Sequence, residues 1–326
     1  MSAAKDPTGP SLLPCHIIAG PLGVGKTTAI IDYARRHADR ERVAVLVNDF
    51  GDVGLDGAII GGAIGTGLDS RIQIVSIPGG CICCIAADGL VQGLAQVAEL
   101  ADIDRIMIEP SGLAMPHQII DLLRQLAEIH PLQLRPVILL MDASKFHSGW
   151  TSEVPYFRNM IDAADILVAN RTDLVKHDEV EKIRAWAQEL DPPKLRFIAT
   201  HHGHIPDDLF EMTAEPTLDV APLDHDHDVV AGQSGGRVWD ANVVFDHDKL
   251  VEAIASLVEN QPLLRLKSIF NTTKGWQRIE FARDQLDRQT TGYRRDNRIE
   301  WITQTPAAQA MQRWVESHLW AADLRQ

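Results

Sequence analysis

The fold is decided by one short stretch, Gly20-Pro21-Leu22-Gly23-Val24-Gly25-Lys26-Thr27-Thr28, which directly follows the apolar residues 15–19. Its pattern is G-x-x-x-x-G-K-T, the phosphate-binding P-loop. In such a loop, backbone N–H groups at the start of a helix face the phosphates of a nucleotide. The lysine reaches the β- and γ-phosphates, and the threonine that follows it binds Mg²⁺ through its hydroxyl. The residues that we expect to contact the nucleotide here are Gly20, Gly23, Val24, Gly25, Lys26, Thr27 and Thr28.

The composition limits the classes of protein that need to be considered. The chain has 326 residues, which is long enough for two domains, and its 45% apolar and 23% charged content is typical of globular proteins. No run of residues approaches the ~18 apolar positions of a membrane helix, and the first residues lack the apolar core of a signal peptide. The net charge of −14 argues against a nucleic-acid partner, because nucleic-acid binding needs a basic surface. We therefore expect a cytoplasmic protein with no membrane or nucleic-acid partner.

Apolar runs rich in Val, Ile and Leu alternate with helical patterns through the first two-thirds of the chain. This alternation predicts an α/β fold, a P-loop domain with a mostly parallel sheet covered by helices on both faces. The expected strands are residues 15–19, 43–47, 72–77, 105–108, 136–141, 166–169 and 195–199. The expected helices are residues 27–38, 86–100, 117–129, 157–163 and 178–190.

The alternating pattern fades after Phe210, where Pro, Asp, Gly, His and Ser become frequent. A second unit follows, with expected strands at 238–245, 264–271, 276–282 and 298–302 and helices at 248–259 and 307–319. We therefore expect a disordered arm at 1–12, a P-loop domain at 13–211, a linker at 212–236 and a small α+β domain at 237–326.

A second nucleotide motif is Asn170-Arg171-Thr172-Asp173, which follows an apolar strand. GTPases carry N-K-x-D at this point, where the aspartate accepts from two donors of guanine that adenine does not offer together. Asn170 would brace the base and its loop, and Arg171 replaces the usual lysine. The alternative is that Asp173 only caps the turn that follows.

Acidic residues after two other strands are candidates for the reaction itself. Glu109 directly follows the expected strand 105–108, and Gly112 lies three residues further on. Glu109 would hold Mg²⁺, and the Gly112 N–H would sense the γ-phosphate. A turn-capping role is the alternative for Glu109. Asp49, and after it Asp52, are candidates to orient the attacking water, although loop acids are commonly just solvated.

Three of the four cysteines lie within four residues, in Cys81-Ile82-Cys83-Cys84. Three thiolates so close together fit one soft cation, and Zn²⁺ would need one further ligand to complete a tetrahedron. A redox pair and plain buried thiols are the alternatives that the spacing leaves open.

These motifs together resemble the CobW-type metal-chaperone GTPases. The resemblance is carried, in chain order, by GPLGVGKTT, NDFGDVGLDG, GGCICC, IEPSGL and NRTD, and it covers essentially the whole chain. It implies GTP hydrolysis coupled to delivery of a transition metal to a client metalloprotein, with Cys81, Cys83 and Cys84 as metal ligands and Thr27 and Glu109 near Mg²⁺. The departures are Asp49 and Asp52, where the family usually has glutamates, and Pro110, where it has Thr or Ala.

The sequence therefore predicts a slow GTPase that binds a divalent metal and passes it on. Lys26, Asp49 and Glu109 are the expected catalytic residues. Zn²⁺ is favoured for the thiolates, Co²⁺ stays open, and a homodimer is one option for the assembly. Two rival functions remain: a P-loop kinase for a small molecule, for which no arginine-rich lid is evident, and a metal buffer or sensor with GTP as an allosteric ligand.

Overall fold

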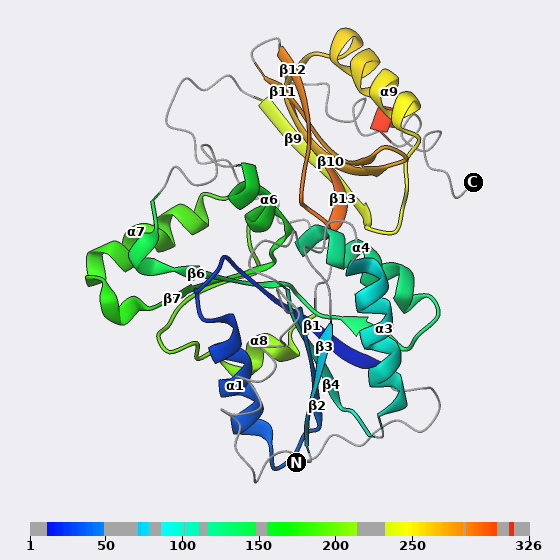
Figure 1. The fold of residues 1–326 in the computed structure, drawn as a ribbon. Helices are drawn as coiled ribbons and strands as arrows, with labels where there is room; N and C mark the ends of the chain where they lie inside the picture. Colours follow the sequence, from blue (N-terminus) through cyan, green and yellow to red (C-terminus); the bar gives the residue numbers. More distant parts are fainter. Residues whose placement is uncertain are drawn as a thin grey trace. The chain divides into compact units, whose positions relative to one another are not determined.

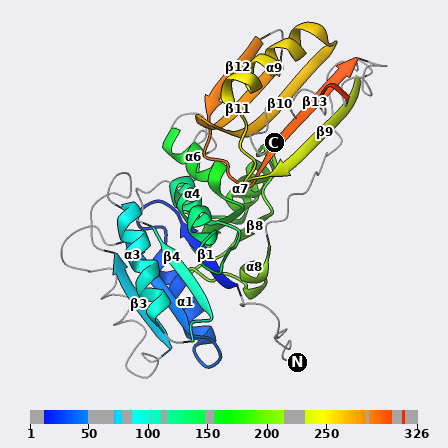
Figure 2. The ribbon, with the colours of Figure 1, turned by 90° about the vertical axis from the view of Figure 1, so that its right-hand side faces the viewer.

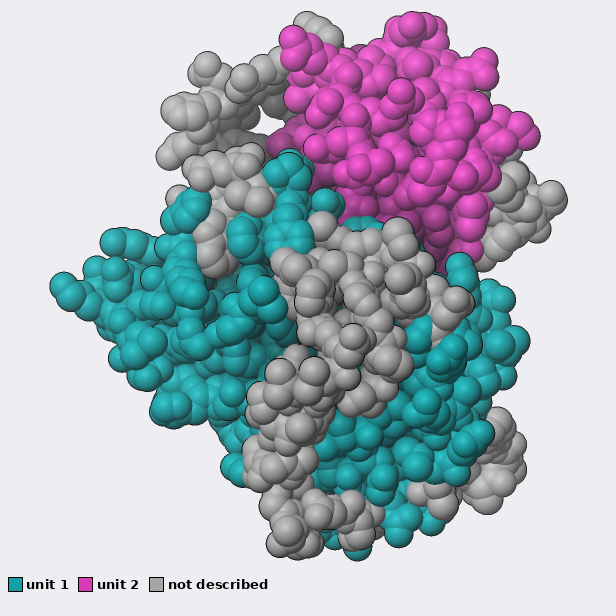
Figure 3. Space-filling model, viewed as in Figure 1, with its two compact units in different colours: residues 1–214 teal, residues 215–326 magenta. Residues whose placement is uncertain are grey.

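The computed structural model describes residues 12–48, 71–77, 86–100, 102–110, 116–147, 155–213, 232–282, 285–304 and 313–315. The chain divides into two compact units, Met1–Ala214 and Glu215–Gln326, which Figure 3 shows in different colours. Each unit has a sheet of its own and is described by itself. Within the described residues, no helix combines the length and the apolar character that a membrane crossing requires.

Unit 1 is built on a parallel sheet in the order β3-β2-β4-β1-β6-β7-β8, with the short β5 paired to the start of β1. The buried strands are continuous in Val, Ile and Leu because helices cover both faces, as the sequence predicts. The strands are β1 (Leu13–Ala19), β2 (Val43–Asn48), β3 (Ile72–Ile77), β4 (Arg105–Glu109), β5 (Leu132–Leu134), β6 (Ile138–Asp142), β7 (Ile166–Asn170) and β8 (Arg196–Ala199).

The helices of unit 1 form two layers (Figures 1 and 2). One face of the sheet packs against α1 (Lys26–His37) and α8 (Asp207–Glu211), with Tyr33 and Phe210 among the buried side chains. The other face packs against four helices, and its core includes Leu94, Leu123 and Ile183. These helices are α3 (Ala86–Glu99), α4 (Pro116–Ala127), α6 (Pro155–Ala163) and α7 (His177–Gln188).

Unit 2 is an antiparallel sheet in the order β12-β11-β10-β13-β9, with α9 (His247–Asn260) packed on one face. The strands are β9 (Gly232–Asp240), β10 (Leu263–Thr272), β11 (Gly275–Ala282), β12 (Gln285–Thr290) and β13 (Asp296–Gln304). This confirms the predicted α+β class of the C-terminal unit. Of the helix expected at 307–319, residues 313–315 are described and are helical.

One expected strand is wrong in position. β9 begins at Gly232, inside the range expected to be linker, and ends at Asp240, five residues before the predicted end at Phe245. The reason is Gly235, which lies against the ring of Trp301 on β13: a Cβ there would stand 2.7 Å from Trp301 Cζ2. A glycine-rich stretch that suggests a linker is therefore a strand that admits a large ring.

Candidate nucleotide-binding site

The turn between β1 and α1 has the geometry that its glycines allow. Gly25 precedes α1 with φ 99°, a left-handed conformation that favours glycine, and a Cβ there would lie 2.6 Å from Asn170 Nδ2. Gly20 leaves β1 with φ 148°, and its Cβ would lie 2.5 Å from the carbonyl oxygen of Leu140. Both glycines are required because another strand approaches the loop at each point.

Lys26 begins α1 and folds back over the loop. Its Nζ donates to the carbonyl oxygens of Gly20 at 3.1 Å and Pro21 at 3.2 Å, and the residue is buried. The ammonium group therefore lies on the loop that would surround the phosphates, which is where P-loop chemistry needs a positive charge.

Thr27 meets Glu109 across two adjacent strands. Strands β1 and β4 run parallel with Ile17 opposite Ile108, so the loop after β1 and the end of β4 meet at one edge. There, Thr27 Oγ1 donates to Glu109 Oε1 at 2.7 Å, and Glu109 is only 6% exposed. A hydroxyl and a carboxylate are the oxygen ligands that Mg²⁺ takes in nucleotide sites, so the donor set fits this ion.

Asn170, the last residue of β7, connects two loops. Its Nδ2 donates to the carbonyl oxygen of Val24 at 2.8 Å, and its Oδ1 accepts from the backbone N–H of Gly203 at 3.0 Å. Its side chain is buried. The P-loop and the loop that follows β8 are therefore held together by one side-chain amide.

The motif Asn170-Arg171-Thr172-Asp173, which is the candidate base-recognition segment, continues into a short 3-10 helix, Thr172–Leu174. The N–H and the Oγ1 of Thr172 both donate to the carbonyl oxygen of Thr200, at 3.1 and 2.9 Å. Asp173 is exposed on this turn. The carboxylate of Asp173 therefore faces solvent, and the backbone that carries it is held by the two hydrogen bonds from Thr172 to Thr200.

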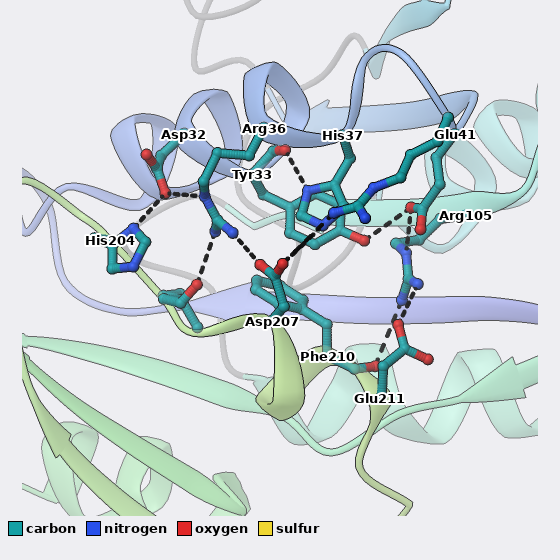
Figure 4. A network of polar contacts seen from close by, with 12 residues as sticks. Asp32, Tyr33, Arg36, His37, Glu41, Arg105, His204, Asp207, Phe210 and Glu211 are labelled. Atoms are coloured by element: carbon teal, nitrogen blue, oxygen red, sulfur yellow. Dashed lines mark hydrogen bonds and ion pairs between the residues drawn. The ribbon is translucent and has the colours of Figure 1, made fainter. Parts of the chain in front are cut away.

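The loop after β8 and helix α8 are bound to α1 by polar contacts (Figure 4). His204 Nδ1 lies 3.1 Å from Asp32 Oδ2, and Arg36 binds both Asp207 and the carbonyl oxygen of Ile205. His37 Nε2 lies 3.2 Å from Asp207 Oδ2. The helix that starts at the P-loop therefore also carries the loop next to the base-recognition segment.

Arg105, at the start of β4, anchors the other end of α8. Its guanidinium is buried and contacts Glu41 at 3.1 Å, Glu211 at 2.6 Å and His16 Nε2 at 2.6 Å. Burial acts to raise the pKa of Glu41, but the hydrogen bond and charge of Arg105 outweigh it and lower that pKa. Burial, and then the charges of Arg105 and Arg135, hold the pKa of His16 well below its usual value, so His16 is neutral and accepts from Arg105.

The structure brings most of the predicted nucleotide residues to one edge of the sheet. The P-loop residues, Glu109, Asn170 and Asp173 lie at or just after the carboxyl ends of β1, β4 and β7, at the edge where ligands of open α/β sheets bind. Six predicted residues lie outside the described residues: Asp49, Asp52, Cys81, Cys83, Cys84 and Gly112. Among the residues described, no group of three or more His, Cys, Asp or Glu side chains is placed to hold a metal.

Several structural residues of this site were missed from the sequence. Asp142 ends β6 and binds Arg171, and Gly203 packs against the backbone of α1, with a Cβ position 2.8 Å from the Ala29 nitrogen. An acid after an apolar strand was the available signal for Asp142. Gly203 and the α8 ion pairs offered none, because their partners are remote in sequence.

Comparison with known proteins places this geometry in a family. Residues 14–197 match the family described as "CobW/HypB/UreG, nucleotide-binding domain". The chain is 29% identical over 318 residues to the zinc chaperone YeiR of Escherichia coli K12, covering 90% of this chain and 93% of that protein. It is 26% identical over 208 residues to "Zinc-regulated GTPase metalloprotein activator 1" of Schizosaccharomyces pombe, covering 61% of this chain and 48% of that protein.

Among solved structures, the Zn(II)-bound YjiA GTPase from E. coli is similar with a TM-score of 0.46 and 16% identity, covering 94% of this chain and 99% of that one. The family match spans more than half of the chain, from β1 into β8. It contains the P-loop residues, Glu109, Asn170 and Asp173. The protein therefore belongs to the CobW/HypB/UreG family, and residues 14–197 are its nucleotide-binding domain.

Proposed function

We propose that this protein is a GTPase metallochaperone, which hydrolyses GTP and transfers a divalent metal ion, with Zn²⁺ favoured, to a client metalloprotein. The observation that carries the GTPase part is the hydrogen bond of Thr27 to Glu109 beside the P-loop lysine. The metal part is supported by the cysteine motif in the sequence and by the names of the relatives, which are zinc chaperones and a zinc-regulated activator.

Different residues of the site contact different parts of the nucleotide. Lys26 and the N–H groups that open α1 bind the β- and γ-phosphates. The exposed carboxylate of Asp173 accepts from guanine, while Asn170 keeps the two loops in register. Thr27 and Glu109 are the residues that would hold Mg²⁺, which neutralises charge on the phosphates when it is bound.

The remaining assignments rest on the sequence. Asp49 is the candidate to orient the attacking water, and Cys81, Cys83 and Cys84 are the candidate ligands of the transported metal. Thiolates bind Zn²⁺ strongly, and Co²⁺ is the alternative cargo. Clustered thiols that must stay reduced agree with the predicted cytoplasmic location. The client and a homodimeric assembly stay predictions.

The test is whether GTP and the metal affect each other's binding. Zn²⁺ affinity is measured by competition titration in three states: without nucleotide, with GDP, and with a non-hydrolysable GTP analogue. We expect the GTP analogue alone to tighten Zn²⁺ binding, by about 5- to 150-fold, and Zn²⁺ to tighten analogue binding by the same factor, as linkage requires. Phosphate release from GTP separates this function from that of a metal buffer.

Two variants serve as matched controls. Replacing Cys83 and Cys84 by Ser should abolish the coupling and leave nucleotide binding without metal intact. Lys26→Ala should abolish tight nucleotide binding and leave metal binding without nucleotide intact. Equal Zn²⁺ affinity of the wild-type protein in all three states would contradict the chaperone mechanism.

A further inference from the structure

Arg171 occupies the second position of the motif Asn170-Arg171-Thr172-Asp173 and makes two contacts through two separate nitrogens. Its Nη1 donates to Asp142 Oδ2 at 2.7 Å, and its Nη2 donates to the carbonyl oxygen of Gly23 at 2.6 Å. The two acceptors belong to different elements, the end of β6 and the P-loop. A guanidinium offers separate donors in a rigid fork, whereas an ammonium is a single point of charge.

Asp142 is itself fixed before it meets Arg171. It lies opposite Asn170 in the pairing of β6 with β7, so the two strand ends are held side by side. Its Oδ1 accepts from the Ser144 N–H at 3.0 Å and from Ser144 Oγ at 2.6 Å. Lys145 Nζ stands 3.8 Å from Oδ2 and is exposed. The Asp142 side chain is 2% exposed, so its orientation is set by these partners rather than by solvent.

Arg171 has a strained backbone that these contacts stabilise. Its φ and ψ are 62° and 34°, a left-handed conformation that is unfavourable for a residue other than glycine. This conformation starts the 3-10 helix that presents Asp173. Asp142, through the Arg171 side chain, therefore stabilises the backbone that presents the carboxylate for the base.

We propose that Asp142 is a positioning residue for guanine-nucleotide binding: it holds the Arg171 guanidinium between β6 and the P-loop, so that the phosphate loop and the base-recognition turn are set relative to each other before the nucleotide arrives. This inference rests on the proposed function, because it assumes that the site takes GTP and GDP. It adds a residue that contacts neither base nor phosphate. Its substitution should weaken both nucleotides alike.

The experiment compares Asp142→Asn, Arg171→Ala, the double variant and Arg171→Lys. Affinity is measured with fluorescent N-methylanthraniloyl-GDP, and KM and kcat with GTP. Asp142→Asn keeps the size and the Ser144 contacts but loses the charge. We expect it to weaken GDP binding and to raise KM about tenfold, with kcat within about twofold of wild type.

The decisive result is the double variant. If Asp142 acts through Arg171, Asp142→Asn with Arg171→Ala should bind GDP no more weakly than Arg171→Ala alone. Arg171→Lys retains the charge but replaces the two guanidinium donors by a single ammonium nitrogen, so its GDP affinity should lie between those of wild type and Arg171→Ala. Losses that multiply in the double variant would overturn the inference, and so would an unchanged affinity in Asp142→Asn.

Asp165→Asn is the matched control for a merely structural role. Asp165 is also a buried carboxylate of this sheet and accepts from the Val137 N–H at 2.9 Å, but it lies at the opposite, amino-terminal end of β7. We expect a lowered Tm with unchanged nucleotide affinity. The same loss of affinity in both aspartate variants would overturn the positioning role.

If Asp142→Asn does not fold, Arg171→Ala becomes the deciding variant, since a wild-type affinity there contradicts the inference. Wild-type protein that binds no guanine nucleotide would instead overturn the proposed function.

Discussion

Oγ1 of Thr27 donates a hydrogen bond of 2.7 Å to Oε1 of Glu109, although the two residues are 82 positions apart in the chain. The contact exists because β1 and β4 are neighbours and parallel, so that the turn after one strand and the last residue of the other meet at the same edge. The contact joins the loop after β1 to the acid that ends β4.

Glu109→Gln should reduce Mg²⁺-dependent GTP hydrolysis at least tenfold and change nucleotide binding without Mg²⁺ only slightly. The amide keeps the size of the side chain and an acceptor for Thr27 but removes the charge that would hold the ion. Phosphate release is measured across a series of Mg²⁺ concentrations. Asp104→Asn, an exposed acid just before β4, is the control and should behave as wild type. An unchanged Mg²⁺ dependence in Glu109→Gln would remove Glu109 from the site.

Asp173→Ala should remove the preference for guanine. We expect the wild-type protein to bind GTP at least tenfold more tightly than ATP, about 1.4 kcal/mol, because an acceptor paired with two base donors is lost with adenine. Calorimetry with both nucleotides measures the ratio. Asp178→Ala, an exposed acid at the start of α7, should keep it. Equal binding of GTP and ATP by wild type would disprove guanine selectivity.

His16→Gln should make folding stability less sensitive to acid between pH 7 and 5. The pKa of His16 is lowered in the folded state by burial and by nearby arginines, so only the unfolded chain takes up this proton near pH 6.5. Wild-type stability therefore falls as the pH drops through this interval, because protons bind to the unfolded chain and not to the folded protein. Gln keeps an acceptor for Arg105 without titrating. Urea unfolding at several pH values gives the difference, and parallel curves for the two proteins would show that His16 does not contribute.

Gly203→Ala should destabilise unit 1 by more than backbone strain alone. Gly203 has φ 71°, and an added Cβ would stand 2.8 Å from the Ala29 nitrogen in α1. Gly23 has a similar φ of 74° with no atom within 4 Å of its Cβ position, so Gly23→Ala reports strain without collision. Without nucleotide, we expect about 1 kcal/mol for Gly23→Ala and at least 2 kcal/mol for Gly203→Ala. If thermal unfolding gives the same loss of stability for Gly203→Ala and Gly23→Ala, the contact of Gly203 with α1 is not rigid.

The parts of the fold that were predictable are those with local patterns. The P-loop spacing at Gly20–Thr28 and the apolar strands specify the parallel sheet, since period and turn chemistry are written in neighbouring residues. Glu109 and Asp173 each end or follow an apolar strand in the sequence, and the structure has both at the same edge of the sheet. Elements without a pattern were missed: β5 has three residues, α8 has five, and β12 is a polar edge strand, Gln285–Thr290.

The partners within the site were less predictable than its elements. That Arg171 binds Asp142 depends on the order of strands β6 and β7, which no spacing between the two residues encodes. Arg105 contacts Glu41, Glu211 and His16, which come from remote segments of the chain. In the sequence, each of these three residues resembles an ordinary solvated or core residue. Such contacts become inferable only when the sheet order is known.

Asn170 connects two loops of the site through the two halves of one side-chain amide. Its amide donates to the carbonyl of Val24 and accepts from the N–H of Gly203, so one side chain serves two loops in opposite senses. Asp has the same length but no donor, Leu has neither group, and Gln is one methylene too long. The consequence of a substitution therefore depends on which half of the amide it removes: Asp keeps the acceptor for Gly203 and loses only the donor to Val24, whereas Leu loses both. Each loop also keeps another contact, from Arg171 to the Gly23 carbonyl and from His204 to Asp32, so the site loses order by degrees.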